Sequence, residues 1–214
     1  MKGLFLATAG VFLILLASEW LWRKKHIRDE LARKFVHILV GTFVAFWPLF
    51  MSWQQIELMS LALLAGVMIS MQLNVFKAVH GVSRQTMGEV FFPVGIGLAA
   101  FFSHTPIIFT AAILHLSLAD GLAAVIGKTF GFRHLYKVNG HRKSLAGSLM
   151  FLLTSMVIIL GVVLHVDIPI TGAVLAVMLL LPVAATVLEN VAVAGTDNLL
   201  VPLLVIIVLR AVGI

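Results

Sequence analysis

The sequence predicts an all-α, polytopic membrane protein with about eight transmembrane helices, and two observations carry this prediction. Of the 214 residues, 61% are hydrophobic and only 11% are charged, whereas soluble domains are about half apolar and a quarter charged. The apolar residues also form runs long enough for a bilayer, which needs about 20 residues per helix. This length leaves room for a single integral membrane domain over residues 1–214.

The first apolar run, 4–22, is longer than a signal-peptide core and lacks a clear cleavage site, so we expect it to remain as an anchor. Seven further runs follow along the chain. The run 90–103 is short and contains two glycines, which makes it the weakest candidate. The runs after the first are 35–52, 56–73, 90–103, 106–127, 146–165, 169–188 and 198–214.

The basic residues gather in alternate junctions between these runs. The junction 23–34 holds six of them, 74–89 holds two and 128–145 holds five, which makes 13 of the 15 Lys and Arg residues. The opposite junctions hold no Lys or Arg. The positive-inside rule therefore predicts that both termini lie outside and that these junctions, with 189–197, face the cytoplasm.

The composition excludes several classes of site and partner. Cysteine is absent, which excludes disulfides, thiolate nucleophiles and Cys-ligated zinc. The net charge of +6 fits membrane topology and anionic headgroups better than nucleic acid. The eight histidines form no HExxH motif or His/carboxylate cluster, and we interpret three of them as structural, namely His104, His115 and His165.

Four carboxylates lie near the predicted cytoplasmic ends of the helices: Glu89, Asp120, Glu189 and Asp197. A carboxylate within a bilayer costs a few kcal/mol, so each needs a partner or a function. Ordinary ion pairs are one interpretation. For Asp120 this is the weaker one, because no basic residue lies within one turn on its own helix. The other interpretation is Mg²⁺ held by carboxylates beside cations that bind nucleotide phosphates.

Two basic segments are candidates for phosphate binding. Lys128 follows Gly127 at the end of the run 106–127, and Lys143 precedes Ser144, a predicted helix N-cap. Free N–H groups at a helix N-terminus beside a cation attract anions, although a capped membrane helix with basic flanks is the alternative. The spacing from Gly121 to Gly127 is not that of a P-loop, because five residues separate the glycines where four are required.

Taken together, these segments resemble the CTP-dependent lipid kinases, which include dolichol kinase, phytol kinase and the yeast-type diacylglycerol kinase. The resemblance covers about residues 30–202. The matching pieces, in the order of the family's motifs, are Arg33-Lys34-Phe35-Val36-His37, Gly88-Glu89 with Phe92-Pro93, Asp120-Gly121-x-Ala123 with Gly127-Lys128-x-x-Gly131, Lys143-Ser144-x-x-Gly147-Ser148, and Glu189 with Asp197-Asn198 and Pro202.

The resemblance implies transfer of the γ-phosphoryl group of CTP to the hydroxyl of a membrane lipid. The acceptor would be a polyprenol, an isoprenoid alcohol of the phytol or farnesol type, or diacylglycerol. Ala146 stands where dolichol kinases tend to have Glu, and the loop 132–142 is short. The sequence therefore does not select among these acceptors.

We expect the site residues to divide by role. Asp120 and Asp197 would coordinate Mg²⁺, with Glu189 or Glu89 as a further ligand or as the base for the lipid hydroxyl. Arg33, Lys34, Lys128 and Lys143 would hold phosphates, and the turn Ser144–Ser148 would add backbone donors. Gly121, Gly127 and Gly147 would allow close approach of the ligand, with His37 and Asn198 facing the same site.

Two other functions are compatible with parts of the pattern. A phosphatidate-type cytidylyltransferase would release pyrophosphate instead of CDP. An anion transporter would need polar residues through to the outer face, whereas the outer junctions are nearly uncharged. A homo-oligomer is also open, because small residues permit close helix packing within or between protomers: Ala111, Ala112, Ala119, Gly121 and Ala123.

Overall fold

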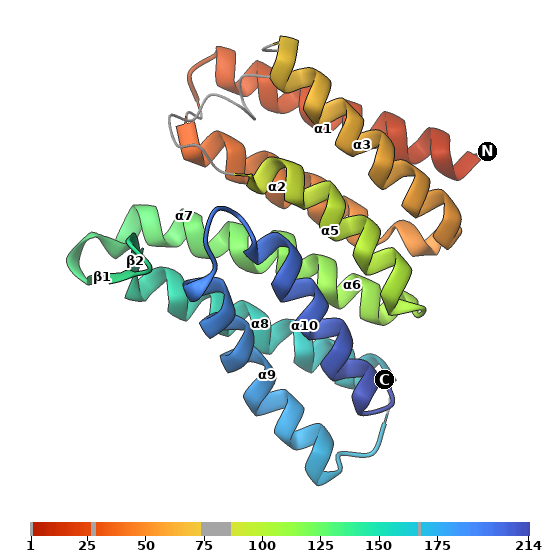
Figure 1. Cartoon of the computed structure of the whole chain (residues 1–214), viewed down its shortest axis with the longest axis vertical. Coiled ribbons are helices and arrows are strands. Elements are labelled where there is room, and N and C mark those ends of the chain that lie inside the picture. The colour runs from red at the N-terminus through yellow and green to blue at the C-terminus, as the bar shows by residue number, and fades with distance from the viewer. Residues whose placement is uncertain (1, 27–28, 74–86, 167) are drawn as a thin grey trace.

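The computed structural model describes residues 2–26, 29–73, 87–166 and 168–214 as a bundle of helices with one small hairpin (Figure 1). The predicted loop residues Arg28, Lys77 and Arg84 lie outside these ranges. The principal elements are α1 Lys2–Arg23, α2 Asp29–Ala45, α3 Trp53–Leu73, α5 Gly88–Ser103, α6 Pro106–Leu114, α7 Asp120–Phe130, β1 Leu135–Val138, β2 His141–Ser144, α8 Leu145–Val166, α9 Gly172–Val191 and α10 Asp197–Ala211.

The predicted all-α polytopic architecture is confirmed. Each expected apolar run coincides with a helix or a continuous pair of helices. Within the described ranges, five helical stretches are long and apolar enough to cross a membrane: Lys2–Arg23, Trp53–Leu73, Pro106–Arg133, Leu145–Val166 and Gly172–Val191. The total of eight spans and the outer position of the termini stay predictions.

The stretch Pro106–Arg133 is the central helix of the bundle. In its most apolar window 67% of the residues are buried, against 17–39% in the other four long helices. Its five small residues noted above are all buried within the protomer. They therefore serve helix packing inside one chain, where α2, α8 and α10 approach this helix. The outer helices expose long apolar faces, as lipid contact requires.

A π-helical turn interrupts the central helix at His115–Ala119, between α6 and α7. The backbone N–H of Asp120 donates to the carbonyl of His115, five residues earlier. The His115 ring contacts the Ala111 carbonyl at 2.8 Å and the Ser155 hydroxyl of α8 at 2.7 Å. The predicted structural role of His115 is therefore confirmed by its contacts.

A β-hairpin occupies the region that the sequence suggested would be a short loop. β1 and β2 pair antiparallel, with Leu135 opposite Ser144 and Val138 opposite His141. The turn residues Asn139 and Gly140 have φ angles of 47° and 79°, as a two-residue hairpin turn requires. Because β2 runs directly into α8, the hairpin is fixed over one end of the bundle.

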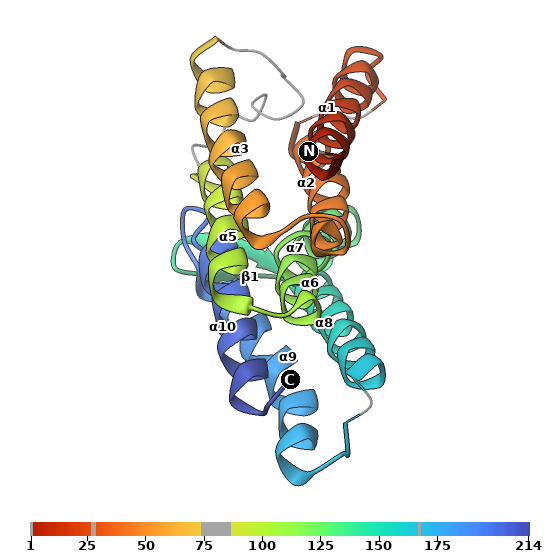
Figure 2. The same ribbon diagram turned by 90° about the vertical axis from the view of Figure 1, so that its right-hand side faces the viewer.

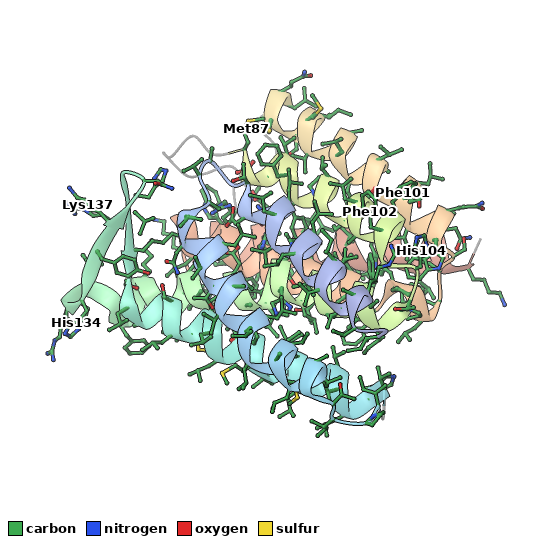
Figure 3. The ribbon with its side chains drawn as sticks, turned by 60° about the horizontal axis from the view of Figure 1, so that its bottom comes forward. Met87, Phe101, Phe102, His104, His134 and Lys137 are labelled. Carbon is green, nitrogen blue, oxygen red and sulfur yellow. The ribbon has the colours of Figure 1, made fainter. Side chains whose placement is uncertain are left out.

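The two ends of the bundle differ in chemistry. Both termini lie at the end away from the hairpin (Figure 1). Figure 3 shows His134 and Lys137 projecting at the hairpin end, while Phe101, Phe102 and His104 lie at the opposite end. The basic residues of the junction 128–145 therefore gather at one end of the bundle, as the positive-inside pattern led us to expect.

Candidate active site

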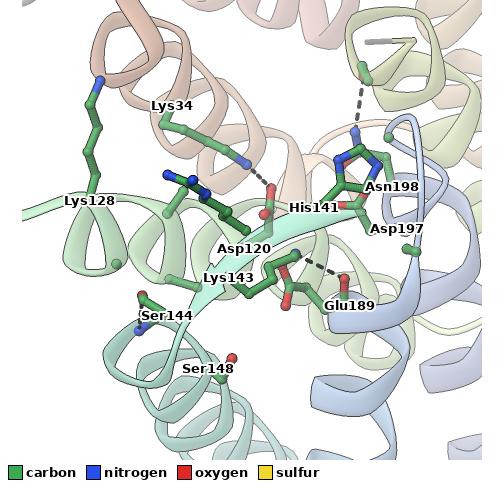
Figure 4. A pocket seen from close by; sticks show the side chains of 18 of the residues that line it. Lys34, Asp120, Lys128, His141, Lys143, Ser144, Ser148, Glu189, Asp197 and Asn198 are labelled. Atoms are coloured by element: carbon green, nitrogen blue, oxygen red, sulfur yellow. Dashed lines mark hydrogen bonds and ion pairs between the residues drawn. The ribbon is translucent and has the colours of Figure 1, made fainter. Parts of the chain in front are cut away.

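A polar cavity of about 300 Å³ lies beneath the hairpin (Figure 4). Its walls come from segments far apart in the sequence: the starts of α2, α5 and α10, the helix α7, the strand β2, the start of α8 and the end of α9. The charged and polar side chains that line it belong to Arg33, Lys34, Asp120, Lys128, His141, Arg142, Lys143, Ser144, Ser148, Glu189, Asp197 and Asn198.

Three carboxylates meet in this cavity. One oxygen from each of Asp120, Glu189 and Asp197 lies within 4.8 Å of the other two. They come from the first turn of α7, the last turn of α9 and the first turn of α10. Carboxylate oxygens are hard ligands that suit Mg²⁺, so the donor set fits the predicted metal. These are the same three residues that the sequence put forward as metal ligands.

Two of the carboxylates have basic partners. Lys34 forms an ion pair with Asp120, and the Lys143 ammonium lies 2.5 Å from Glu189 Oε1 and 3.2 Å from its backbone carbonyl. Asp197, in the junction before the apolar part of α10, has no ion pair among the described residues. Burial raises the pKa of Asp197, and the nearby Asp120 carboxylate raises it further. Lys34 and Lys143 lower this pKa, but by less. The cluster is therefore a place where an added cation is stabilised.

His37 lies beside the Asp120 carboxylate but does not itself line the cavity. Its Nε2 is 2.7 Å from the Leu116 carbonyl and 3.3 Å from Asp120 Oδ2. Its ring packs against Phe92 with centroids 4.5 Å apart. Because a carbonyl only accepts hydrogen bonds, Nε2 carries the hydrogen. The contacts hold the ring in one orientation.

The start of α8 has the predicted cap. The Ser144 hydroxyl accepts the N–H of Gly147 at 3.1 Å, which confirms Ser144 as the N-cap. The N–H of Leu145 donates to the His134 carbonyl at 3.0 Å. Two of the backbone donors expected to serve an anion are thus already paired. Phosphate binding here would depend more on the lysine side chains than on the helix N-terminus.

The three predicted glycines do different things. Gly127 and Gly147 line the cavity and face one another, and a Cβ on either would come within 3.4 Å of the other's Cα. Gly121 does not line the cavity. A Cβ there would overlap Ile38 of α2, so Gly121 allows α2 to approach α7. That approach is what puts Lys34 beside Asp120.

Asn198 connects the site to α5. Its Nδ2 donates to the Gly88 carbonyl at 3.0 Å, while its buried Oδ1 has no hydrogen-bond partner among the described residues. Nearby, Gly195 has a φ of 91° and packs against the backbone of Gly88. The start of α5 is therefore held tightly against the start of α10.

Comparison with known proteins identifies the family. The chain is 34% identical to the phytol kinase of Synechocystis sp. over 204 residues, which cover 92% of this chain and 86% of that protein. The chain belongs to the phytol kinase family. It is also 33% identical over 171 residues to a probable phytol kinase 2, chloroplastic, of Oryza sativa subsp. japonica, covering 72% of this chain and 55% of that protein. A probable phytol kinase, chloroplastic, of Zea mays is 29% identical over 234 residues.

No protein-family model matches the chain, and no solved structure matches it. The sequence motifs resembled those of a lipid kinase family that includes phytol kinase. The comparisons confirm this family assignment.

The predicted site residues divide between this cavity and a neighbouring groove. Twelve of them line the cavity, and His37 contacts Asp120 from the neighbouring groove. Glu89, expected to be catalytic, lines an apolar groove beside the cavity together with Arg33 and His37. The twelve are Arg33, Lys34, Asp120, Gly127, Lys128, Lys143, Ser144, Gly147, Ser148, Glu189, Asp197 and Asn198.

Sequence reasoning missed the hairpin residues that complete the site. His141 and Arg142 of β2 line the cavity. Tyr136 of β1 donates to Asn190 Oδ1 at 2.6 Å and also hydrogen-bonds Ser148, which connects the hairpin to α8 and α9. The Asn139-Gly140 pair was the available signal, because it is typical of a two-residue hairpin turn.

Proposed function

We propose that this protein is a Mg²⁺-dependent lipid kinase that transfers the γ-phosphoryl group of CTP to the hydroxyl of an isoprenoid alcohol of the phytol type. The single observation that carries the proposal is the cluster of Asp120, Glu189 and Asp197 within 4.8 Å, inside a cavity ringed by basic side chains. Membership in the phytol kinase family supports the lipid alcohol as acceptor and the nucleoside triphosphate as donor.

The charges of the cavity suit a triphosphate with its metal. Asp120, Glu189 and Asp197 would hold Mg²⁺, which when bound neutralises charge that develops on the transferring phosphoryl group. Lys34 and Lys143 already lie against the carboxylates and would turn to the phosphates. Lys128 is exposed at the mouth of the cavity and makes no ion pair with described residues. It would contact the outermost part of the nucleotide.

In the proposed step, the hydroxyl oxygen of the alcohol forms a bond to the γ-phosphorus. The bond from that phosphorus to the β–γ bridging oxygen breaks, and CDP leaves with the bonding electrons. The hydroxyl proton passes to a carboxylate, for which Glu89 is the candidate on the acceptor side. Such transfers depend chiefly on positioning and charge neutralisation, which this arrangement of side chains supplies.

Two finer assignments rest on other observations. The choice of CTP rests on the resemblance to CTP-dependent lipid kinases, because no residue of the cavity identifies the base by itself. The cytoplasmic orientation rests on the basic junctions, which lie at the end of the bundle that holds the cavity.

The test is incubation of the purified protein with γ-labelled CTP or ATP and a panel of phytol, farnesol, a longer polyprenol and diacylglycerol. We expect label in the phytol product, preference for CTP and release of CDP. Release of pyrophosphate when a lipid phosphate is supplied in place of the alcohol would indicate a cytidylyltransferase instead. Absence of labelled lipid with every acceptor and both nucleotides would overturn the proposal.

A further inference from the structure

A second cavity, of about 210 Å³, lies between two pairs of helices next to the candidate active site. Helix α1 packs on α2, and α3 packs on α5. Figure 2 shows these two pairs standing on opposite sides. The cavity between them is a groove whose lining is mostly apolar, and none of the three clustered carboxylates of the active site lines it.

The groove changes character along its length. At the hairpin end its lining includes Arg33, His37 and Glu89. Further along the same helices only apolar side chains remain, such as Val40 of α2 and Leu63 of α3. A site with one polar end and an apolar body matches an amphipathic ligand that carries a single polar head.

The polar end of the groove joins the candidate active site. Arg33 and Gly88 line both cavities. His37 lines the groove while its Nε2 lies 3.3 Å from the Asp120 carboxylate. A ligand head at this end of the groove is therefore separated from the metal cluster by one side chain.

We propose that this groove holds the hydrocarbon chain of the alcohol substrate, with its hydroxyl between His37 and Glu89. The inference rests on the proposed function, since it assigns the acceptor of that same reaction to a place. Because Nε2 of His37 donates to Leu116, Nδ1 is the acceptor atom of the neutral ring, and no described residue donates to it. The hydroxyl has one hydrogen, which it donates to Nδ1 of His37 when the alcohol binds. As the bond to phosphorus forms, the hydroxyl turns that hydrogen to the Glu89 carboxylate on the opposite wall, which receives the proton.

The length of the groove sets how much of the chain it recognises. Arg33 and Val40 are seven residues apart on α2, which corresponds to about 10 Å along a helix. Ala62 and Ser70 on α3 give about 12 Å in the same way. The groove therefore holds only the part of the chain near the hydroxyl, and the remainder of a long alcohol extends into the bilayer. The enzyme should be tolerant of chain length beyond that first part.

Gly66 of α3 offers a direct test. It lines the groove, and a Cβ there would meet nothing within 4 Å, so Gly66→Leu fills the groove without disturbing the fold. Gly161 of α8 is the matched control, because it is also exposed with open space around it but lies outside the groove. We expect Gly66→Leu to lower kcat/KM for phytol about tenfold, the loss that follows when about two methylene groups lose their burial. The KM for the nucleotide should not change, and Gly161→Leu should match the parent.

Photo-crosslinking of the parent protein provides a second measurement that does not depend on a variant. The probe is a long-chain alcohol with a diazirine near the hydroxyl end of its chain. We expect label on α3 and α2 within the groove, reduced by excess phytol. Full activity of Gly66→Leu toward phytol, or label confined to other helices, would overturn the groove assignment. If the parent phosphorylates no alcohol, the proposed function fails, and the crosslinks still decide whether the groove binds one.

Discussion

Lys34 and Asp120 form a buried ion pair although 86 residues separate them in the sequence. Their side chains are 8% and 9% exposed. The pair joins α2 to α7, and it exists because Gly121 lets these helices approach closely. The carboxylate thus has both a structural partner and a position in the proposed metal cluster, so its two roles must be separated by experiment.

Replacement of Asp120 by Asn should abolish phosphoryl transfer and also lower the temperature of unfolding. The loss of stability follows because Lys34 would remain buried without its counter-ion, which costs about 3 kcal/mol or more in such pairs. The double variant Asp120→Asn with Lys34→Met should recover most of the stability but none of the activity. Thermal unfolding and the labelled-CTP assay measure the two effects. Recovery of activity in the double variant would remove Asp120 from the metal site.

Removal of divalent metal should stop the reaction, and Mg²⁺ should restore it. In the absence of nucleotide, Mg²⁺ should raise the unfolding temperature of the parent, because a ligand at about 100 times its Kd adds about 2.7 kcal/mol of stability. Asp197→Asn should lose this thermal response, since Asp197 is the one carboxylate of the three without an ion pair among the described residues. An equal response in that variant would place the metal elsewhere.

Gly195→Ala should destabilise the protein and impair catalysis together. Gly195 has a φ of 91°, and a Cβ there would lie 2.5 Å from the backbone nitrogen of Gly88. Backbone strain of this kind costs about 1–3 kcal/mol before the overlap is counted. Gly213→Ala is the matched control, because Gly213 also has a positive φ, 81°, but no atom within 4 Å of the added Cβ. We expect a clearly larger fall in unfolding temperature for Gly195→Ala. Similar values for both variants would show that the contact with Gly88 is unimportant.

Tyr136→Phe should raise the KM for the nucleotide and lower the unfolding temperature by only about 2–4 °C. The hydroxyl connects the hairpin to Asn190 and Ser148, and one such hydrogen bond contributes about 1 kcal/mol, which corresponds to about fivefold in affinity. Thr129→Val is a useful control, because among the described residues the Thr129 hydroxyl bonds only the Val125 carbonyl of its own helix. A parent-like KM in Tyr136→Phe would mean that the hairpin does not cover the nucleotide.

The sequence allowed the helices and most of the site to be predicted, for identifiable reasons. Long apolar runs mark the helices directly. Asp120, Glu189 and Asp197 were recognisable because a carboxylate near the end of a membrane helix is costly unless it has a partner or a function. The partner of Asp120 was not predictable in the same way. Helical periodicity shows neighbours on one helix, so it gave no sign that Lys34 would approach from α2.

The position of Glu89 was missed for a related reason. Glu89 and Gly88 are adjacent in sequence, yet Gly88 lines both cavities whereas Glu89 lines only the groove. The direction of a side chain at the start of α5 depends on how that helix packs against α10, which no local pattern encodes. The hairpin did carry a local signal in Asn139-Gly140, but the π-helical turn before Asp120 has no comparable sequence mark.

That π-helical turn gives the central helix two independent registers. A π turn contains one residue more than an α-helical turn needs, and each residue of an α-helix rotates the following side chains by about 100°. The part of the helix up to His115 faces the core, where His115 contacts Ser155. The part from Asp120 onward faces Lys34 and the hairpin. If the same residues formed a regular α-helix throughout, the reactive face would be turned by about 100° away from its partners. The orientation of the reactive face relative to the core therefore depends on the number of residues in this turn, not on their types.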